Sequence, residues 1–151
     1  TTDYTSRTKD VHIFQGVDPY ATKTIVPEFG KISNFCSGIQ KLVQRYTICL
    51  LTELGTQEGF SDFGTTLLTT LNNRSLSLNK NDLYPLFNIA SAKVIREFRQ
   101  YQAKNPDMPD DEKLNTVLLE DIIVTTDQVQ LNIKIYPISQ TAVQFVIPLP
   151  K

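Results

Sequence analysis

The spacing of apolar residues changes once along this chain, and this change limits the folds that are open to it. From Ile32 to Leu50 apolar side chains recur every three or four residues, which is typical of one face of a helix. Between Val129 and Ile135 every second residue is apolar and the residues between are polar, as in a strand that is buried on one face. This order predicts an α+β protein with helices first and a small antiparallel sheet last.

Length and charge narrow the classes of protein further. The 151 residues are enough for one domain with a hydrophobic core. Fifteen basic and 16 acidic side chains leave a net charge of −1, which argues against nucleic acid as a partner because binding to phosphates needs a basic surplus. No apolar run approaches about 18 residues and no signal segment is recognisable, so we expect a soluble, intracellular protein that does not contact a membrane.

Residues 1–30 are polar, and we predict that they form an extended N-terminal arm attached to a domain at residues 31–151. Two short apolar groups, at 11–14 and 24–26, have the composition of brief strands but no apolar partner nearby in sequence. Such a segment cannot bury itself alone. We therefore expect the arm to lie along the domain or along a neighbouring subunit.

Two long helices with a short helix between them are predicted in the middle of the chain. The first begins at Ile32, includes Gly38 and ends near Gly55. A short helix then places the leucines of 67–71 inward, and the second long helix begins at Asn81 or Asp82 and closes before Pro106.

Cys36 and Cys49 both fall within the first predicted helix. Thirteen residues at a rise of about 1.5 Å each would separate them by about 20 Å, which is too far for a disulfide. His12 is the single histidine and no Cys-x-x-Cys pair occurs. We expect two free thiols, no metal site and no cofactor.

The last third predicts a three-stranded antiparallel β-meander. An apolar run at 118–124, the alternating segment 129–135 and a second alternating segment at 143–147 are joined by connections short enough for hairpins. The last strand runs into Pro148-Leu149-Pro150, and proline cannot donate to a neighbouring strand. We therefore expect an open edge at the C-terminus that can accept a strand from another chain.

Paired carboxylates are the one catalytic pattern that the sequence offers. Glu53, Glu58 and Asp62 flank a glycine-rich loop at 55–64, and a glycosidase needs two acids about 5 to 9.5 Å apart. The structural alternative is that Glu53 ends one helix while Asp62 caps the next. No nucleophile elbow or phosphate-binding glycine loop accompanies these acids, so we expect that the protein is not an enzyme.

A basic segment in the second long helix is followed by an acidic segment. Residues 93–104 carry four basic side chains against Glu97, and residues 107–121 carry six acidic side chains against Lys113. The pattern is typical of a solvated face whose charges balance, and a docking patch is the alternative.

The segment around the glycine-rich loop resembles the signature of the GPW-type, or lysozyme-like, baseplate-wedge family. Leu50-Leu51-Thr52-Glu53-Leu54-Gly55 matches the leucine-threonine helix end and glycine, and Phe60-Ser61-Asp62-Phe63-Gly64-Thr65-Thr66-Leu67 matches the aromatic-glycine pair that opens a helix. A long helix and a terminal β-meander follow in that family, as expected here for residues 35–147. The residues that carry this structural loop motif are Thr52, Gly55, Phe60, Phe63 and Gly64.

Two departures from the family pattern stand out. Ser61-Asp62 replaces a loop proline, and Asp110-Asp111-Glu112-Lys113-Leu114 stands where many members have Glu-Pro-Arg before the strands. Lys113 cannot copy the planar two-point contact that arginine makes with a carboxylate. A wedge contact is predicted here at Glu112 and Lys113, together with Phe14 and Tyr20 of the arm.

The resemblance implies a structural protein of the virion. Family members join the tail baseplate wedge near the tube and start the contractile sheath, whose arms add strands to the C-terminal sheet. Expected partners are thus the tail sheath protein and other wedge and hub proteins, with assembly in the host cytoplasm. The predicted sheath-contact strand is Val143, Gln144, Phe145, Val146 and Ile147. A type VI secretion baseplate subunit and, less favoured, a peptidoglycan-cleaving glycosidase stay open as alternatives.

Overall fold

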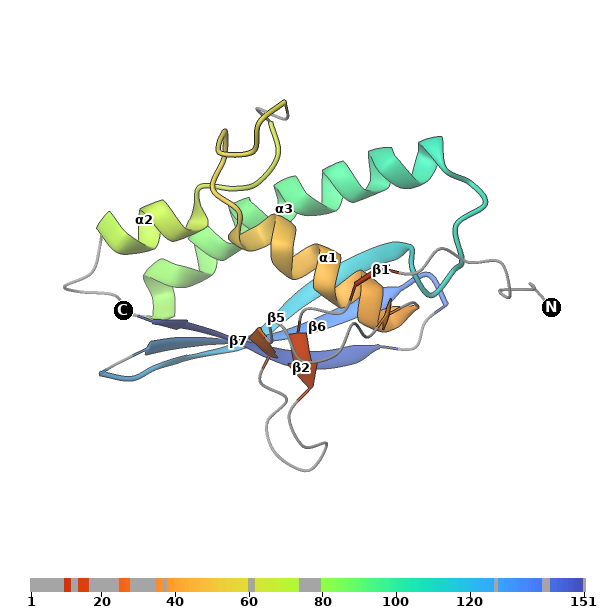
Figure 1. Cartoon of the computed structure of the whole chain (residues 1–151). Coiled ribbons are helices and arrows are strands. Elements are labelled where there is room, and N and C mark those ends of the chain that lie inside the picture. The colour runs from red at the N-terminus through yellow and green to blue at the C-terminus, as the bar shows by residue number, and fades with distance from the viewer. Residues whose placement is uncertain are drawn as a thin grey trace.

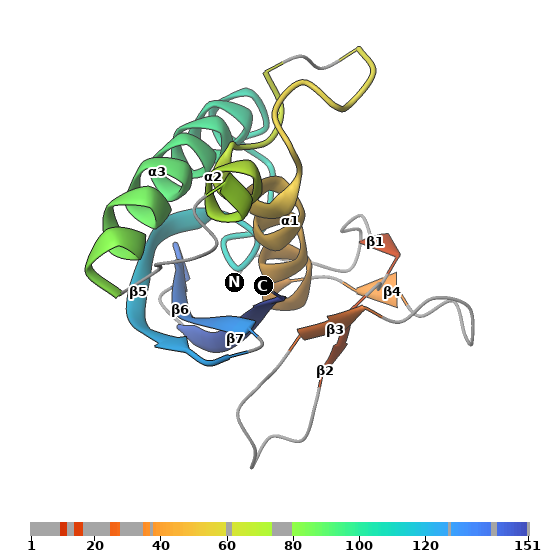
Figure 2. The same cartoon turned by 90° about the vertical axis from the view of Figure 1, so that its left-hand side faces the viewer.

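The computed structural model describes residues 10–11, 14–16, 25–27, 35–36, 38–59, 62–73, 80–126, 128–139 and 142–150. Within these ranges three helices pack on one face of a three-stranded antiparallel sheet (Figures 1 and 2). The helices are α1 (Ile39–Leu51), α2 (Leu67–Asn73) and α3 (Lys80–Lys104). The sheet has the order β5 (Leu114–Val124), β6 (Gln128–Pro137) and β7 (Val143–Pro150). The α+β class, the three helices and the terminal meander are confirmed.

The alternation in β6 places its apolar side chains against the helices. Val129, Leu131, Ile133 and Ile135 are buried, and the polar residues between them are half-buried on the opposite face. The helices supply the other half of the core, including Leu42, Tyr46, Leu50, Leu83, Phe87, Val94 and Phe98. Full burial of each such side chain stabilises the fold by about 1.5 to 3 kcal/mol.

The first helix begins later than the apolar period predicted. Gly38 is the N-cap residue of α1 with φ 66°, a left-handed conformation that stops the helix from extending toward residue 32. Phe35 and Cys36 instead form strand β4 (Phe35–Cys36). The prediction that Cys36 shares a helix with Cys49 is therefore wrong, because periodic spacing cannot report a positive φ. Cys49 is a buried free thiol, as predicted.

The described part of the arm consists of short paired strands. β1 (Asp10–Val11) pairs with β4, and β2 (Phe14–Gly16) pairs with β3 (Ile25–Pro27), both antiparallel. β3 lies beside β7 at the border of the sheet (Figure 2). Phe14 is thus placed in β2, whereas Tyr20 lies outside the described residues.

Two strands extend a few residues beyond the bounds predicted from the sequence. β5 starts at Leu114 rather than at 118, and β7 continues through both prolines to Pro150. A register shift between Leu119 and Asp121 marks a bulge in β5. None of the described helices is both long and apolar enough to cross a bilayer.

Candidate functional site

The loop motif, at residues 50–55 and 62–67 of the described chain, forms a connector whose two ends are joined by hydrogen bonds. Thr52 is the C-cap of α1, and its carbonyl oxygen accepts from the Thr65 N–H at 2.8 Å. The Leu54 N–H donates to the Thr65 carbonyl at 3.0 Å, and the Thr65 hydroxyl donates to the Leu50 carbonyl at 2.6 Å. The ends of the loop therefore form a short parallel bridge that links α1 to α2.

Gly64 explains why the motif requires a glycine at this position. Its φ is 99°, and a Cβ added there would lie 2.4 Å from the carbonyl oxygen of Thr52. Gly55 has φ 81° in the turn after α1. Phe63 is half-buried against the core, as expected of an apolar anchor, and Phe60 lies outside the described residues.

Lys93 of α3 holds the far side of the loop. Its ammonium donates to the Asp62 carbonyl at 2.5 Å and to the Gly64 carbonyl at 2.7 Å, and it pairs with Glu97 one turn along the helix. The Cys49 thiol donates to the same Glu97 carboxylate at 3.5 Å. Burial, followed by the nearby Glu97 charge, raises the pKa of Cys49 to about 11. The thiol is therefore protonated at neutral pH, which makes it a poor nucleophile.

The carboxylates considered for glycosidase chemistry line neither of the two pockets found at the described residues of the helical layer. Glu53 uses both oxygens at the start of α2, accepting from the Thr69 N–H at 2.9 Å and from its hydroxyl at 2.5 Å. The expectation that Asp62 caps the next helix is wrong: Glu53 bonds to the start of α2, while Asp62 is exposed and contributes its backbone carbonyl to Lys93. Glu58 is exposed in the loop. Within the described ranges, no three His, Cys, Asp or Glu side chains are grouped to hold a metal ion.

The predicted wedge-contact pair is engaged inside the chain. Glu112 is 2% exposed; its carboxylate accepts from the Gly38 N–H at 2.9 Å and lies 3.6 Å from the Lys41 ammonium. Lys113 donates to the Pro106 carbonyl at 3.0 Å and lies 3.7 Å from Asp110. These bonds join the start of α1 to the start of the sheet, and a wedge contact at this position stays a prediction.

Side chains form hydrogen bonds with the backbone of β5, which is one edge of the sheet. The Gln102 amide accepts from the Leu114 N–H at 2.6 Å and donates to the Leu114 carbonyl at 3.2 Å, and Arg99 donates to the Asn115 carbonyl at 3.0 Å. Further along, the Ile122 N–H donates to the Asp121 carboxylate at 2.8 Å. Side chains thus bond to backbone groups at Leu114, Asn115 and Ile122, and a bulge interrupts the strand between them, which disfavours an added strand.

The other edge, β7, is regular, directs main-chain groups outward and has β3 beside it. It pairs with β6 without interruption from Ile135↔Val143 to Gln128↔Pro150. Because proline cannot donate, Pro148 and Pro150 fit this ladder with their nitrogens on the outer side. By the two-residue period of a strand, the N–H groups of Gln144 and Val146 also face outward.

The side chains of the predicted sheath-contact strand have little surface to offer. Phe145 and Ile147 are buried toward the helices, and Val146 is buried on the other face of the sheet. Val143 is half-buried, and Gln144 is exposed and donates to Glu120 at 2.7 Å. Recognition at β7 would therefore depend on main-chain hydrogen bonds. The sequence found this strand through its terminal prolines, but it gave no sign of the side chains that close β5.

Comparison of the chain with protein-family models, with curated proteins and with solved structures gives no significant match. The resemblance to the GPW-type family rests on the loop motif and on the order of the elements.

Proposed function

We propose that this chain is a structural subunit of a contractile phage tail baseplate, which joins the wedge near the tail tube and initiates the sheath by strand addition to β7. The observation that carries this proposal is the difference between the two edges of the sheet. Gln102, Arg99 and Asp121 bond to the backbone of β5 at three residues, whereas β7 directs the N–H groups of Gln144 and Val146 outward.

The geometry of β7 suits an incoming strand better than a small ligand. An added strand exchanges main-chain hydrogen bonds along its length and needs a rigid, regular edge. Burial of Phe145 and Ile147 in the core holds β7 in place, and the two prolines restrict donation to its first half. This is the half, 143–147, for which the sheath contact is predicted.

A structural role also agrees with the use of the carboxylates. Glu53, the strongest catalytic candidate, stabilises the start of α2 through Thr69. Glu58 is exposed in the loop. The proposal therefore assigns no catalysis to this chain.

Co-expression with the tail sheath protein of the same phage tests the proposal. Gln144→Pro removes one outward N–H while leaving the β6 ladder intact, as Pro148 does naturally, and Gln144→Ala removes the contact with Glu120 but keeps the N–H. We expect Gln144→Pro to reduce sheath capture about tenfold and Gln144→Ala to keep it. Equal capture by wild type and a folded Gln144→Pro variant would overturn strand addition at this edge.

A further inference from the structure

The helical layer carries an elongated surface that the proposed sheath contact does not use. Its first part is a hollow of about 530 Å³ between α2 and α3, with Leu67 and Ala90 buried in its floor. Two large apolar side chains at this hollow are open to solvent, Ile89 at 72% and Leu54 at 42% exposure. Exposed aliphatic side chains beside a hollow are typical of a docking surface.

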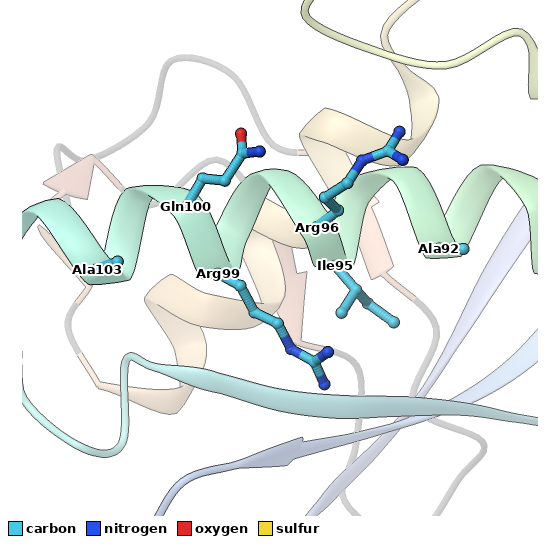
Figure 3. Close-up of a pocket in the computed structure, with 6 residues that line it drawn as sticks. All are labelled: Ala92, Ile95, Arg96, Arg99, Gln100 and Ala103. Atoms are coloured by element: carbon cyan, nitrogen blue, oxygen red, sulfur yellow. The ribbon is translucent and has the colours of Figure 1, made fainter.

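A second hollow, of about 650 Å³, continues along α3 (Figure 3). Arg96 and Gln100 point to one side of the helix, and Ile95 and Arg99 to the other, with the small side chains of Ala92 and Ala103 at the two ends. Ala92 and Arg96 line both hollows, so the two parts form one surface. We call this surface, from Leu54 and Ile89 to Ala103, the α3 groove.

Two arginines of the α3 groove, Arg96 and Arg99, form no ion pair with an acid in the described part of the chain. Arg96 is exposed and makes no ion pair or hydrogen bond with any residue in the described part of the chain. Arg99 donates to the carbonyl of Asn115, and this neutral partner does not offset the charge of the guanidinium. Lys93 is the groove cation that has an acidic partner, Glu97.

The acidic segment that follows α3 is paired elsewhere. Asp110 lies beside Lys113, Glu120 lies 3.9 Å from Lys134, and Asp121 lies 3.0 Å from Lys80. None of these three pairs involves Arg96 or Arg99. An acidic partner would complement Arg96 and Arg99.

The shape of the groove indicates which element such a partner would present. α3 satisfies its own backbone groups, so this surface cannot accept an added strand. From Ile89 to Ala103 the groove follows 15 residues of α3, or about 21 Å, the length of roughly four helical turns. Small side chains at Ala92 and Ala103 allow a second helix to approach closely.

We propose that the α3 groove docks an amphipathic helix of a partner protein, with apolar side chains at the Leu54 and Ile89 end and carboxylates beside Arg96 and Arg99. Apolar burial would supply affinity, and the arginines would set register and orientation. The groove lies on α3 and beside α2, and does not involve β7, so this binding is independent of sheath initiation.

Selection from a displayed library of amphipathic helices about 20 residues long, with the purified full chain as the probe, tests this inference. We expect enrichment of helices that join an apolar stripe to Asp and Glu. Arg96→Glu should weaken the selected helices about tenfold, and selection against that variant should enrich Lys and Arg instead. Ile89→Asp should weaken binding to a similar extent by removing the exposed aliphatic anchor.

Two controls test whether binding depends on the shape and apolar residues of the groove or on charge alone. Leu118→Ser changes another exposed aliphatic residue, on the sheet face away from the helices, and should leave binding unchanged. A proline in the middle of a selected helix should abolish binding while its charge stays the same. The inference is overturned if no helix is enriched, if the enriched helices bind Arg96→Glu and Ile89→Asp as well as wild type, or if the proline-containing peptides still bind. Arg96, Ile89 and Leu118 are all exposed, so thermal melting of each variant should match wild type.

Discussion

The Glu112 carboxylate accepts a hydrogen bond from the Gly38 backbone N–H at 2.9 Å, across 74 positions of sequence. Gly38 immediately precedes α1, and Glu112 precedes β5 by two residues. A buried anion at a helix N-terminus satisfies free N–H groups and interacts favourably with the helix dipole. This bond therefore positions the helical layer on the sheet.

Removing that anion should destabilise the protein. We expect Glu112→Ala to lower the free energy of unfolding by about 2 to 3 kcal/mol, because the buried Gly38 N–H loses its acceptor and the Lys41 ammonium loses a nearby opposite charge. Urea unfolding followed by circular dichroism measures the change. Asp107→Ala, at an exposed acid of the same segment, is the control and should change the midpoint little. A Glu112→Ala midpoint equal to that of wild type would contradict the structural role of the bond.

Substitution of two loop glycines distinguishes the cost of backbone strain from the cost of a steric clash. Gly59 and Gly64 have φ values of 80° and 99°, but a Cβ at Gly59 meets nothing within 4 Å, whereas one at Gly64 meets the Thr52 carbonyl oxygen at 2.4 Å. We expect Gly59→Ala to cost about 1 kcal/mol and Gly64→Ala about 3 kcal/mol or more of unfolding free energy. Thermal and urea unfolding of both variants provide the test, and equal losses would show that the loop relaxes around the added methyl group.

Cys49 should resist alkylation in the folded protein. With its pKa raised to about 11 by burial and by Glu97, the thiolate is scarce at about pH 8. We expect iodoacetamide to modify Cys49 about a hundredfold more slowly in the native protein than in urea, measured by mass spectrometry of its peptide. Modification at the unfolded rate would show that the thiol is accessible.

The same thiol should make stability depend on alkaline pH. The folded pKa lies above the ordinary thiol value, so its contribution is complete below the unfolded pKa and is lost as pH rises toward about 11. The unfolding free energy should therefore decrease over this window, and Cys49→Ala should decrease less steeply. Identical pH profiles for the two proteins would contradict a protonated, buried Cys49.

The arm should influence access to β7. Because β3 lies beside β7, a strand that adds to this edge must displace or pass it. Under the proposed function, we expect deletion of residues 1–30 to increase sheath capture severalfold in the same co-expression experiment. Capture that stays the same or falls would show that β3 does not compete for the edge and that the arm supports binding instead.

Much of the fold could be predicted because periodicity is a local property. Helical spacing from Ile39 to Leu51 and strand alternation from Val129 to Ile135 each follow from which side chains share a face. The start of α1 could not be predicted, since apolar residues keep helical spacing on both sides of Gly38. The sequence does not reveal that this glycine has a positive φ, which stops the helix. The cap of α2 could not be predicted for a similar reason, since Asp62 is nearer in sequence but the path of the loop brings Glu53 to the Thr69 N–H.

The sequence by itself determined the class and order of the elements, the glycine-loop motif and the C-terminal strand ending in two prolines. Only the tertiary structure decided which edge of the sheet is closed, where Glu112 lies and how the α3 groove is formed. Gln102 reaches Leu114, Glu112 reaches Gly38 and Leu54 comes beside Ile89 only after the helices have packed on the sheet. The side-chain period describes one element at a time, whereas these contacts depend on how separate elements meet.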